Sequence, residues 1–298
     1  MDDNSSLKEA LSATSTAVER VLEPFLALSG GPEDRVIEAM RYSVFSGGKR
    51  LRPFLVLASA ELFGVDRSQA LRVAAAIECV HCYSLIHDDL PAMDDDDLRR
   101  GKPTVHIQFD EATAILAGDA LQALAYEILA SEETHADPYV RVALVKELAR
   151  ASGHHGMVGG QMIDLTAEDH DMDEMFIYRL QQMKTGALIS FSAEAGAIMG
   201  HASKGARASI QGYARDLGLA FQIADDLLDV EGSEEEVGKA VGKDEDAGKA
   251  TLVTLMGLER ARNQARILSD QAIEHLAGFD DKASLLRAVA HFAINRRA

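Results

Sequence analysis

The feature that most constrains the fold of this chain is a helical repeat of apolar residues over long segments. Between positions 210 and 228, apolar side chains recur every three or four residues, at Ile210, Tyr213, Leu217, Phe221, Ala224 and Leu228. This spacing is typical of one face of an α-helix. No proline follows Pro138, so that kind of helix break is missing from the second half. Alternating β-branched and aromatic runs, which indicate strands, are nearly absent.

The pattern therefore predicts an all-α protein, and the 298 residues are interpreted as a single domain, residues 1–298. Aromatic residues make up 5% of the chain and tryptophan is absent, so the core must be built from Leu, Ala, Ile, Val and Met. One long polar loop is expected over residues 231–249. The expected helices cover about 5–28, 33–46, 51–64, 68–90, 110–131, 137–152, 155–166, 172–199, 204–230, 251–277 and 282–295.

Charge and cysteine content exclude several classes of protein. Thirty basic and 48 acidic residues give a net charge of −18, which argues against nucleic acid or an anionic membrane as the main partner. We expect no membrane insertion, because no apolar run looks long enough to span a bilayer, and the polar start is no secretory signal. Cys79 and Cys82 lie in an apolar helical run and are interpreted as buried thiols rather than as a redox or metal pair. A cytoplasmic location fits best.

Six aspartates occur between Asp88 and Asp97, at the end of an apolar segment. On a regular helix Asp88 and Asp94 would lie about 240° apart and would not share a face. Pro91 stands between them and disfavours a regular helix there. We therefore expect the helix to end or kink at 89–91, with the chain turning Asp94 back toward Asp88. His81, seven residues before Asp88, lies on the same stripe.

A second aspartate cluster contains Asp225, Asp226 and Asp229. Asp225 and Asp229 lie about 40° apart on one helix face, and Gln222 extends that stripe. Their neighbours are apolar rather than the lysine or arginine of a solvated face, so these carboxylates need a compensating charge.

Oxygen ligands alone, without a His or Cys set of zinc spacing, point to Mg²⁺, which usually completes its shell with water and substrate phosphates. Arg99 and Arg100 follow the first cluster, and Gly47–Pro53 (GGKRLRP) forms another positive patch. Guanidinium groups bind phosphate oxygens, and glycines let backbone N–H groups approach them. A lone aspartate run is usually a solvated loop, and a lone GGKR is a weak signal. Together, the two acidic clusters and the two basic patches predict a metal site that holds a polyphosphate.

These motifs resemble those of the trans-isoprenyl diphosphate synthase family, and most closely its bacterial farnesyl diphosphate synthases. SGGKRLRP, HCYSLIHDDLPAMDDDDLRRGKPTVH, GGQMIDL, KTG and FQIADDLLD stand in the family order. The resemblance covers the chain from about residue 30 to its end. It implies an all-α barrel of long antiparallel helices around an apolar cavity, and a homodimer.

The resemblance also assigns site residues. It implies three Mg²⁺ ions per site, with Mn²⁺ as an alternative ion, held by Asp88, Asp89, Asp94, Asp225, Asp226 and Asp229. Arg99, Lys184 and Lys243 would contact the allylic diphosphate, with Lys249 ranked lower. The isopentenyl diphosphate pocket would be metal-free and formed by Gly48, Lys49, Arg52, His81 and Arg100.

The implied reaction condenses isopentenyl diphosphate with dimethylallyl or geranyl diphosphate. Metal and cations neutralise the departing diphosphate, and the allylic cation must be shielded from water. Neutral oxygens of Thr185 and Gln222 can stabilise that cation, with Lys184 beside them. No side-chain base is obvious, so the released diphosphate is expected to take the proton.

Tyr83 lies five residues before Asp88, about 7.5 Å along the helix. In the family, an aromatic residue here, together with the inserted residues between the aspartates, marks C15 synthases. If the growing tail runs down this helix, the tyrosine closes the cavity, which predicts farnesyl diphosphate as the product. The alternative interpretation is that Tyr83 is an ordinary core residue without effect on product length.

Other functions compete with this one. A geranylgeranyl or geranyl diphosphate synthase would use the same chemistry with a different cavity floor. A terpene cyclase would lack the isopentenyl diphosphate site, and DDLLD at 225–229 argues against it. A non-catalytic partner subunit would tolerate broken motifs, and none is broken here. A divalent-cation buffer would have little use for Arg99 and Arg100.

Overall fold

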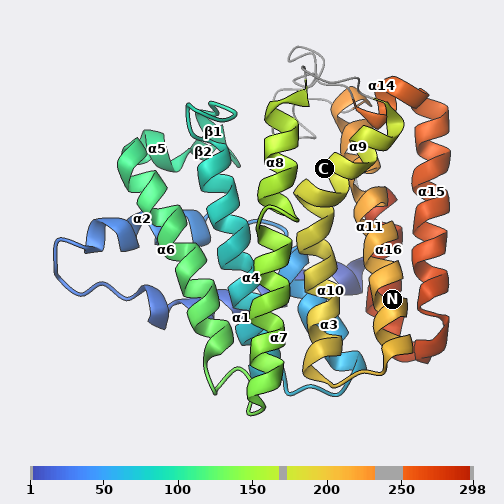
Figure 1. Cartoon of the computed structure of the whole chain (residues 1–298), viewed down its shortest axis with the longest axis horizontal. Coiled ribbons are helices and arrows are strands. Elements are labelled where there is room, and N and C mark those ends of the chain that lie inside the picture. The colour runs from blue at the N-terminus through green and yellow to red at the C-terminus, as the bar shows by residue number, and fades with distance from the viewer. Residues whose placement is uncertain (1–2, 168–172, 232–250, 296–298) are drawn as a thin grey trace.

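The protein is a bundle of long helices in a computed structural model that describes residues 3–167, 173–231 and 251–295 (Figure 1). Two-residue strands pair antiparallel, Leu98 with Pro103 and Arg99 with Lys102. The elements are α1 (Asp3–Leu22), η1 (Pro24–Leu26), α2 (Asp34–Val44), α3 (Leu51–Leu62), α4 (Arg67–Asp88), β1 (Leu98–Arg99), β2 (Lys102–Pro103), α5 (Val105–Gln108), α6 (Glu111–Ala130), α7 (Pro138–Ser152), α8 (Met157–Leu165), α9 (Glu174–Gln181), the π-helical η3 (Gln182–Gly186), α10 (Ala187–Met199), α11 (Lys204–Glu231), α14 (Leu252–Met256), α15 (Leu258–His275), η4 (Ala277–Ala283) and α16 (Ser284–Asn295).

The predicted helices are confirmed, with corrections at their ends and breaks. The first ends at Leu22 because Pro24 follows, and the expected 251–277 helix divides at Gly257, which has φ 80°. The expected 172–199 helix contains the π-helical turn η3 between α9 and α10. Neither the β1–β2 hairpin nor α5 was predicted. The expected loop at 231–249 lies almost entirely outside the described residues.

Side-chain caps explain where several helices begin. Asp66, Asp110, Asp137 and Asp173 each accept backbone N–H groups at the start of α4, α6, α7 and α9. Each cap depends on residues within a few positions, so it fixes where the helix begins. The length of the helix depends instead on its apolar repeat.

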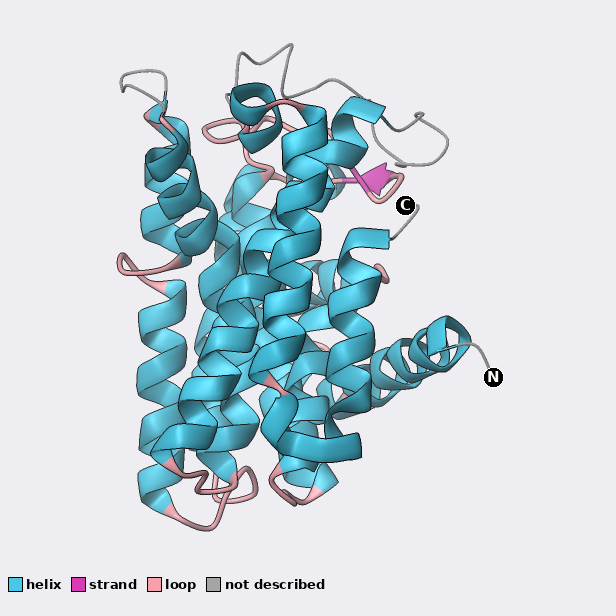
Figure 2. Ribbon diagram, turned by 90° about the vertical axis from the view of Figure 1, so that its right-hand side faces the viewer, coloured by secondary structure: helices cyan, strands magenta, loops and turns pink. Residues whose placement is uncertain are grey.

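Most helices run along the bundle, whereas α1 lies across them (Figures 1 and 2). Helix α3 is central, since its residues enter two core clusters: Val56 packs with α4, and Leu55 packs with α10 and α11. The core consists of Leu, Ala, Ile, Val and Met with few aromatics, as predicted. Cys79 and Cys82 are free, buried thiols, which confirms that interpretation too.

Helix α6 qualifies our expectation about membrane-length segments. Of the described helices, only α6 has the length and composition to cross a membrane, and half of its most apolar window is buried in the protein. A buried core helix passes the same test, so this is a weak indication.

Close packing of α3 against α10 yields a stability prediction. A Cβ atom at Gly196 would lie 2.2 Å from the backbone nitrogen of Ala60. Gly196→Ala should therefore force the helices apart and lower the free energy of unfolding by about 2 kcal/mol. Gly205→Ala, in the first turn of α11 with only Ser203 Oγ 4.0 Å away, is the matched control and should be neutral or stabilising. Urea unfolding followed by circular dichroism measures both; equal midpoints for the two variants would contradict the packing argument.

Candidate active site

The first aspartate cluster begins where α4 stops. The helix ends at Asp88, and the Asp94 N–H donates to the Asp88 carbonyl oxygen at 2.9 Å. Met93 N–H and Asp95 N–H both donate to the carbonyl of Leu90, which closes the turn around Pro91. The predicted break at 89–91 and the return of Asp94 to Asp88 are thus confirmed.

Asp88 is the unusual carboxylate of this cluster. Its Oδ1 is buried and has no hydrogen-bond partner among the described residues. Burial raises the pKa of the Asp88 carboxyl to about 6, with a further rise from Asp94 and Asp89, while Lys184 and Arg99 oppose it. A carboxylate in this state is partly compensated and still has an unused oxygen.

Asp89 is already paired within the protein. Arg99 of β1 donates from Nε to both Asp89 oxygens at 2.8 Å and from Nη2 to Oδ1 at 2.5 Å. Asp89 is 2% exposed, and burial keeps its pKa above the ordinary value in spite of Arg99. This ion pair fastens the β1–β2 hairpin to the end of α4.

The second cluster lies near the end of α11 that precedes the undescribed residues 232–250, at the upper end of the bundle in Figure 1, as does the end of α4. Asp225 is exposed, Asp229 is partly buried, and Asp226 is buried. Gln181 Nε2 of α9 donates to Asp226 Oδ2 at 3.2 Å, so Asp226 is tied into the bundle. Asp225 and Asp226 therefore meet different surroundings although they are adjacent.

The π-helical segment η3 joins the two sides of the site. Lys184 Nζ is 2.7 Å from Asp164 Oδ2 of α8, and its positive charge also acts on Asp88. Gly160 allows this approach, because a Cβ atom there would lie 2.3 Å from the backbone nitrogen of Lys184. On its other side, η3 packs against α11, where a Cβ at Gly218 would lie 3.4 Å from the Cα of Gly186.

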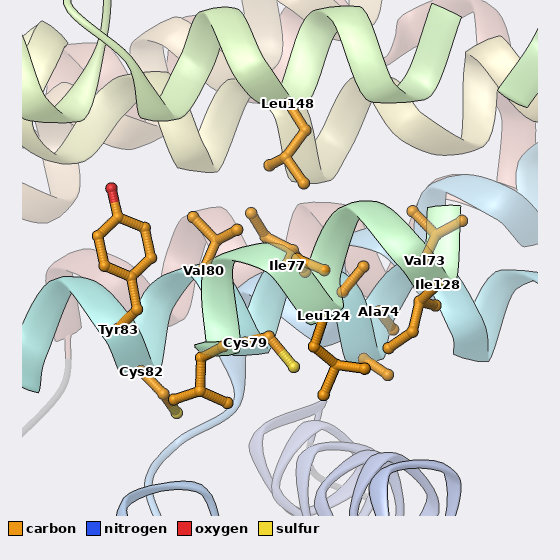
Figure 3. Close-up of a cluster of buried hydrophobic side chains, with 14 of the residues drawn as sticks. Val73, Ala74, Ile77, Cys79, Val80, Cys82, Tyr83, Leu124, Ile128 and Leu148 are labelled. Carbon is orange, nitrogen blue, oxygen red and sulfur yellow. The ribbon is translucent and has the colours of Figure 1, made fainter. Parts of the chain in front are cut away.

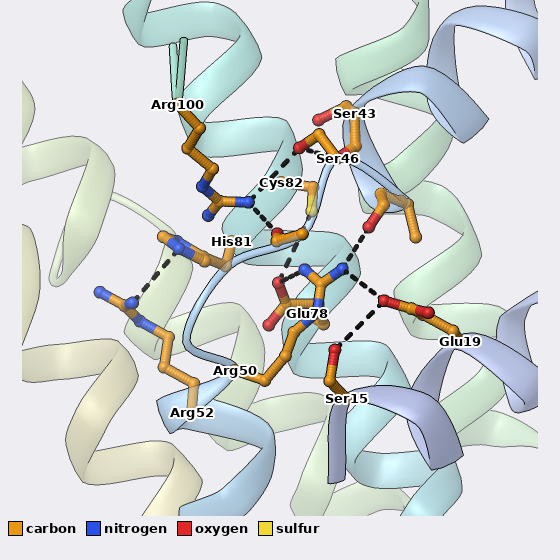
Figure 4. Close-up of polar contacts among 12 residues, drawn as sticks. Ser15, Glu19, Ser43, Ser46, Arg50, Arg52, Glu78, His81, Cys82 and Arg100 are labelled. Carbon is orange, nitrogen blue, oxygen red and sulfur yellow. Dashed lines mark hydrogen bonds and ion pairs between the residues drawn. The ribbon is translucent and has the colours of Figure 1, made fainter. Parts of the chain in front are cut away.

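A pocket of about 540 Å³ is lined in part by α4 and the β1–β2 hairpin, the elements that also carry Asp88 and Arg99. It unites the predicted pocket residues Gly48, Lys49, Arg52, His81 and Arg100, which come from the 45–50 loop, α3, α4 and the β1–β2 turn. Figure 4 shows Arg52 and Arg100 approaching His81 from two sides. The pocket is also lined by Ser46, Arg50, Leu51, Glu78, Ile189 and Phe221.

His81 is neutral in this arrangement. Burial, together with the cations Arg52, Arg100, Arg99 and Arg50, holds the pKa of the imidazole well below its ordinary value. Arg52 Nη1 lies 3.4 Å from His81 Nε2, and a guanidinium can only donate, so Nε2 must be the acceptor. The pocket thus offers several donors to an anion and has little negative charge at its surface.

Arg52, which lines the pocket, interacts electrostatically with Asp225 of the second aspartate cluster. Burial lowers the pKa of Arg52, and the carboxylates of Glu78 and Asp225 oppose that change. Asp225 on α11 is therefore close enough to act electrostatically on α3, and Asp88 on α4 feels Lys184 on η3.

Tyr83 is 5% exposed and points from α4 toward the side where Leu148 of α7 lies, whereas Cys82 points the other way (Figure 3). Burial raises the pKa of its phenol to about 12, with Gln122 of α6 opposing this. His87 packs edge-on against its ring at 5.6 Å between centroids. Tyr83 therefore has little room to move.

Sequence reasoning missed Arg50, Glu78, Asp164 and Gln181, which hold the predicted residues in place. Glu78 did carry a signal, because it is a lone charge in the apolar run AAAIECVHC. Lys243 and Lys249 lie outside the described residues.

The carboxylates fit a hard cation. Their donors are all oxygen, and Asp88 Oδ1 is buried with its hydrogen-bonding capacity unused. Among the described residues, no three His, Cys, Asp or Glu side chains already form a metal cage. This is expected for Mg²⁺, which is usually bound by one or two carboxylates together with substrate phosphates.

Comparison with known proteins identifies the class. The polyprenyl synthetase family profile matches residues 33–290. A farnesyl diphosphate synthase of Escherichia coli (strain K12) is 46% identical over 302 residues, covering 99% of both chains. A crystal structure of an FPP/GFPP synthase from Zymomonas mobilis has a TM-score of 0.89 and 54% identity, covering 97% of this chain and 99% of that one. The large subunit 1 of a heterodimeric geranylgeranyl pyrophosphate synthase of Arabidopsis thaliana is 46% identical, over 88% of this chain and 72% of that protein.

The chain therefore belongs to the polyprenyl synthetase family. The family resemblance, the all-α fold of isoprenyl synthases and the assignment as an enzyme are confirmed at this level.

Asp88 should destabilise the metal-free protein at neutral and alkaline pH. Its carboxyl has a pKa of about 6 in the folded protein against an ordinary 3.8, so the folded state binds the proton more tightly. The folded state therefore loses stability as pH rises from about 4 to 6, by up to about 3 kcal/mol at pH 8. Asp88→Asn should raise the melting temperature in EDTA at pH 8, with roughly half of the free-energy gain remaining at pH 5.

Asp97→Asn, an exposed carboxylate of the same loop, is the control and should change neither melting temperature. A variant Asp88→Asn that is less stable than the wild type at pH 8 in EDTA would show that the carboxylate is fully compensated.

Proposed function

We propose that this protein is a Mg²⁺-dependent prenyltransferase that condenses isopentenyl diphosphate with dimethylallyl and then geranyl diphosphate to give farnesyl diphosphate. The observation that carries the proposal is that two different kinds of binding site are built from shared structural elements. A metal-type carboxylate cluster and a cationic pocket share α4 and the β1–β2 hairpin, which would let the protein hold two diphosphates together. The similarity to farnesyl diphosphate synthases over nearly the whole chain supports it.

The carboxylates Asp88, Asp89, Asp94, Asp225, Asp226 and Asp229 would hold up to three Mg²⁺ ions, with Mn²⁺ as an alternative. Bound Mg²⁺ would supply the charge that neutralises the allylic diphosphate as its C–O bond ionises. Asp88 is the strongest candidate because its buried oxygen lacks a partner among the described residues. Asp89 would act indirectly, by positioning Arg99, which donates a hydrogen bond to it.

Cationic side chains would bind the oxygens of the allylic diphosphate. Lys184 is held near Asp88 by Asp164, so its ammonium is already oriented before a substrate arrives. Arg99 brings a second positive charge. Lys243 and Lys249 remain predicted contacts of this group.

The segments η3 and α11 would line the path of the allylic cation. Thr185 adjoins Lys184 in η3, and Gln222 is partly buried on α11. Their neutral oxygens can stabilise a carbocation without being alkylated as readily as a carboxylate. The surrounding apolar side chains exclude water, which would otherwise convert the cation to an alcohol.

Isopentenyl diphosphate would occupy the 540 Å³ pocket without metal. Lys49, Arg52 and Arg100 would bind its diphosphate, Gly48 would let the backbone approach, and the neutral His81 would donate from Nδ1, because its Nε2 accepts from Arg52. Its double bond would then have to face the allylic site for the attack. The proton released after attack would go to the departing diphosphate, because no side-chain base is evident.

We assign the C15 product because Tyr83 narrows the bundle along α4. Its ring is buried and confined between His87 and the side chains of α6, which supports a closed cavity floor. A geranylgeranyl or geranyl diphosphate synthase is the alternative, and similarity to an FPP/GFPP synthase and to a geranylgeranyl pyrophosphate synthase subunit makes product length a property to test.

We further propose a single-domain, cytoplasmic homodimer without membrane insertion. The two free cysteines support a reducing compartment. Large apolar side chains exposed on neighbouring helices α6 and α7, among them Leu116, Tyr139 and Val142, support an association between copies.

The direct test is incubation of the purified protein with dimethylallyl and isopentenyl diphosphates, with Mg²⁺ or with EDTA, and chromatography of the dephosphorylated prenols. We expect farnesol as the main product with Mg²⁺ and none with EDTA.

Asp88→Ala should lose turnover by about a thousandfold or more while its far-UV helical signal remains, since several interactions with the departing diphosphate depend on it. Undiminished turnover by Asp88→Ala would place the metal elsewhere.

Tyr83→Ala should lengthen the product. Removing the ring opens space along α4, so chains of C20 and beyond should replace part of the C15 product in the same chromatogram. Ser84→Ala is the matched control, because Ser84 is adjacent but its hydroxyl bonds back to the His81 carbonyl at 2.8 Å. An unchanged C15 profile in Tyr83→Ala would remove Tyr83 as the determinant of length.

A further inference from the structure

Arg50 belongs to the basic motif GGKRLRP and lines the pocket, yet its guanidinium is engaged by partners inside the protein. The residue is 3% exposed, and its guanidinium lies beneath the 45–50 loop (Figure 4). It forms an ion pair with Glu78 of α4 and donates to the carbonyl of Val44. Its Nη2 also lies 3.4 Å from Glu19 Oε1 of α1. One buried side chain thus connects the loop to three helices, α1, α2 and α4.

The loop above Arg50 has an unusual backbone. Gly47, Gly48 and Arg50 have φ values of 84°, 125° and 48°, so three of four consecutive residues occupy the positive-φ region. For an arginine this conformation is unfavourable and persists only where surrounding contacts determine it. The bonds from Arg50 to Glu78 and Val44 are contacts of that kind, because they hold both ends of the loop against α4.

The loop conformation in turn locates two predicted ligands of the diphosphate. Lys49 lies between Gly48 and Arg50, so its position follows that of Arg50. Arg100 donates to the Gly47 carbonyl, and a Cβ atom at Gly48 would lie 2.7 Å from the Arg100 guanidinium. Any shift of the loop would therefore displace both Lys49 and Arg100.

Glu78 has a second role in the same place. It lines the pocket, and its Oε2 is buried without a hydrogen-bond partner among the described residues. Its negative charge stabilises the protonated forms of Arg50, Arg52 and Arg100. Four cations gathered around a free pocket would repel each other, and a buried carboxylate among them reduces that repulsion.

We propose that Arg50 and Glu78 are positioning residues that hold the 45–50 loop and Arg100 in the geometry that binds isopentenyl diphosphate. This inference rests on the proposed function of the pocket. It assigns to Arg50 a role different from that of its neighbours Lys49 and Arg52, which would touch the substrate. Neither Arg50 nor Glu78 would act in the allylic site.

A purely structural ion pair would affect stability alone, so the test must separate stability from binding. Arg50→Met leaves Glu78 as an unpaired buried charge and is expected to lower the melting temperature. The double variant Arg50→Met/Glu78→Met removes both charges with side chains of similar length, and should recover much of that loss. If the pair positions the loop, the double variant will still bind the ligand poorly.

The measurement is calorimetric binding of isopentenyl diphosphate in EDTA, where only the metal-free pocket can respond. We expect the dissociation constant of the double variant to rise at least about tenfold, because small displacements of binding groups have effects of this size. In Mg²⁺ the KM for isopentenyl diphosphate should rise similarly, with the KM for the allylic diphosphate within about twofold of the wild type. Lys49→Ala serves as the positive control and should show the same split.

Arg207→Met/Glu194→Met is the matched negative control. Arg207 Nε donates to Glu194 Oε1 at 3.1 Å between α11 and α10, and neither residue lines the pocket. Removing that pair should lower the melting temperature and leave isopentenyl diphosphate binding unchanged.

Binding by Arg50→Met/Glu78→Met with the wild-type dissociation constant would overturn the positioning role, as would equal increases in both KM values. If the wild-type protein itself does not bind isopentenyl diphosphate in EDTA, the proposed function of the pocket fails, and the inference fails with it. The two failures are distinguishable, because one appears in the variant and the other in the wild type.

Discussion

Compensation of charge at one end of an apolar bundle is the interaction on which this structure depends. Asp88 and Asp89 end a helix whose other side chains are largely buried, and carboxylates in such a place would be costly without nearby cations. Arg99 satisfies Asp89, and Lys184 acts on Asp88 while being held by Asp164. The compensation is incomplete, since Asp88 keeps a raised pKa and an unused oxygen. A stable fold in which the negative charge of Asp88 is incompletely compensated is suited to bind a cation.

The same principle operates with opposite sign in the neighbouring pocket. Several cationic side chains line this pocket. The buried carboxylate of Glu78 compensates their positive charge, and His81 stays neutral. In a chain of net charge −18, a diphosphate is repelled by most of the surface, so this local excess of positive charge decides where it can bind. Acidic and basic sites share elements, because α4 carries both His81 of the pocket and Asp88, and α11 carries both Phe221 of the pocket and the second aspartate cluster.

The helices supply rigidity, and several backbone positions with positive φ lie next to the site. Gly47, Gly48 and Arg50 lie in the loop, and Arg100 with Gly101 forms the turn of the β1–β2 hairpin, all with positive φ. Such conformations are held by surrounding contacts, and they occur often where ligands are bound.

Local signals in the sequence were enough for the helices, the core composition and the break at Pro91, because each depends on residues within a few positions. The motifs were also enough to predict the family, which the comparisons confirm. Pairings across long sequence separations were decided only by the tertiary structure. Lys49, Arg50 and Arg52 are indistinguishable as charges in the sequence, and it is Glu78, 28 residues after Arg50, that draws one of them into the interior. In the same way, the order of residues cannot reveal that Arg99 pairs with Asp89 or Lys184 with Asp164, because a charge selects its partner by distance and burial in the folded chain.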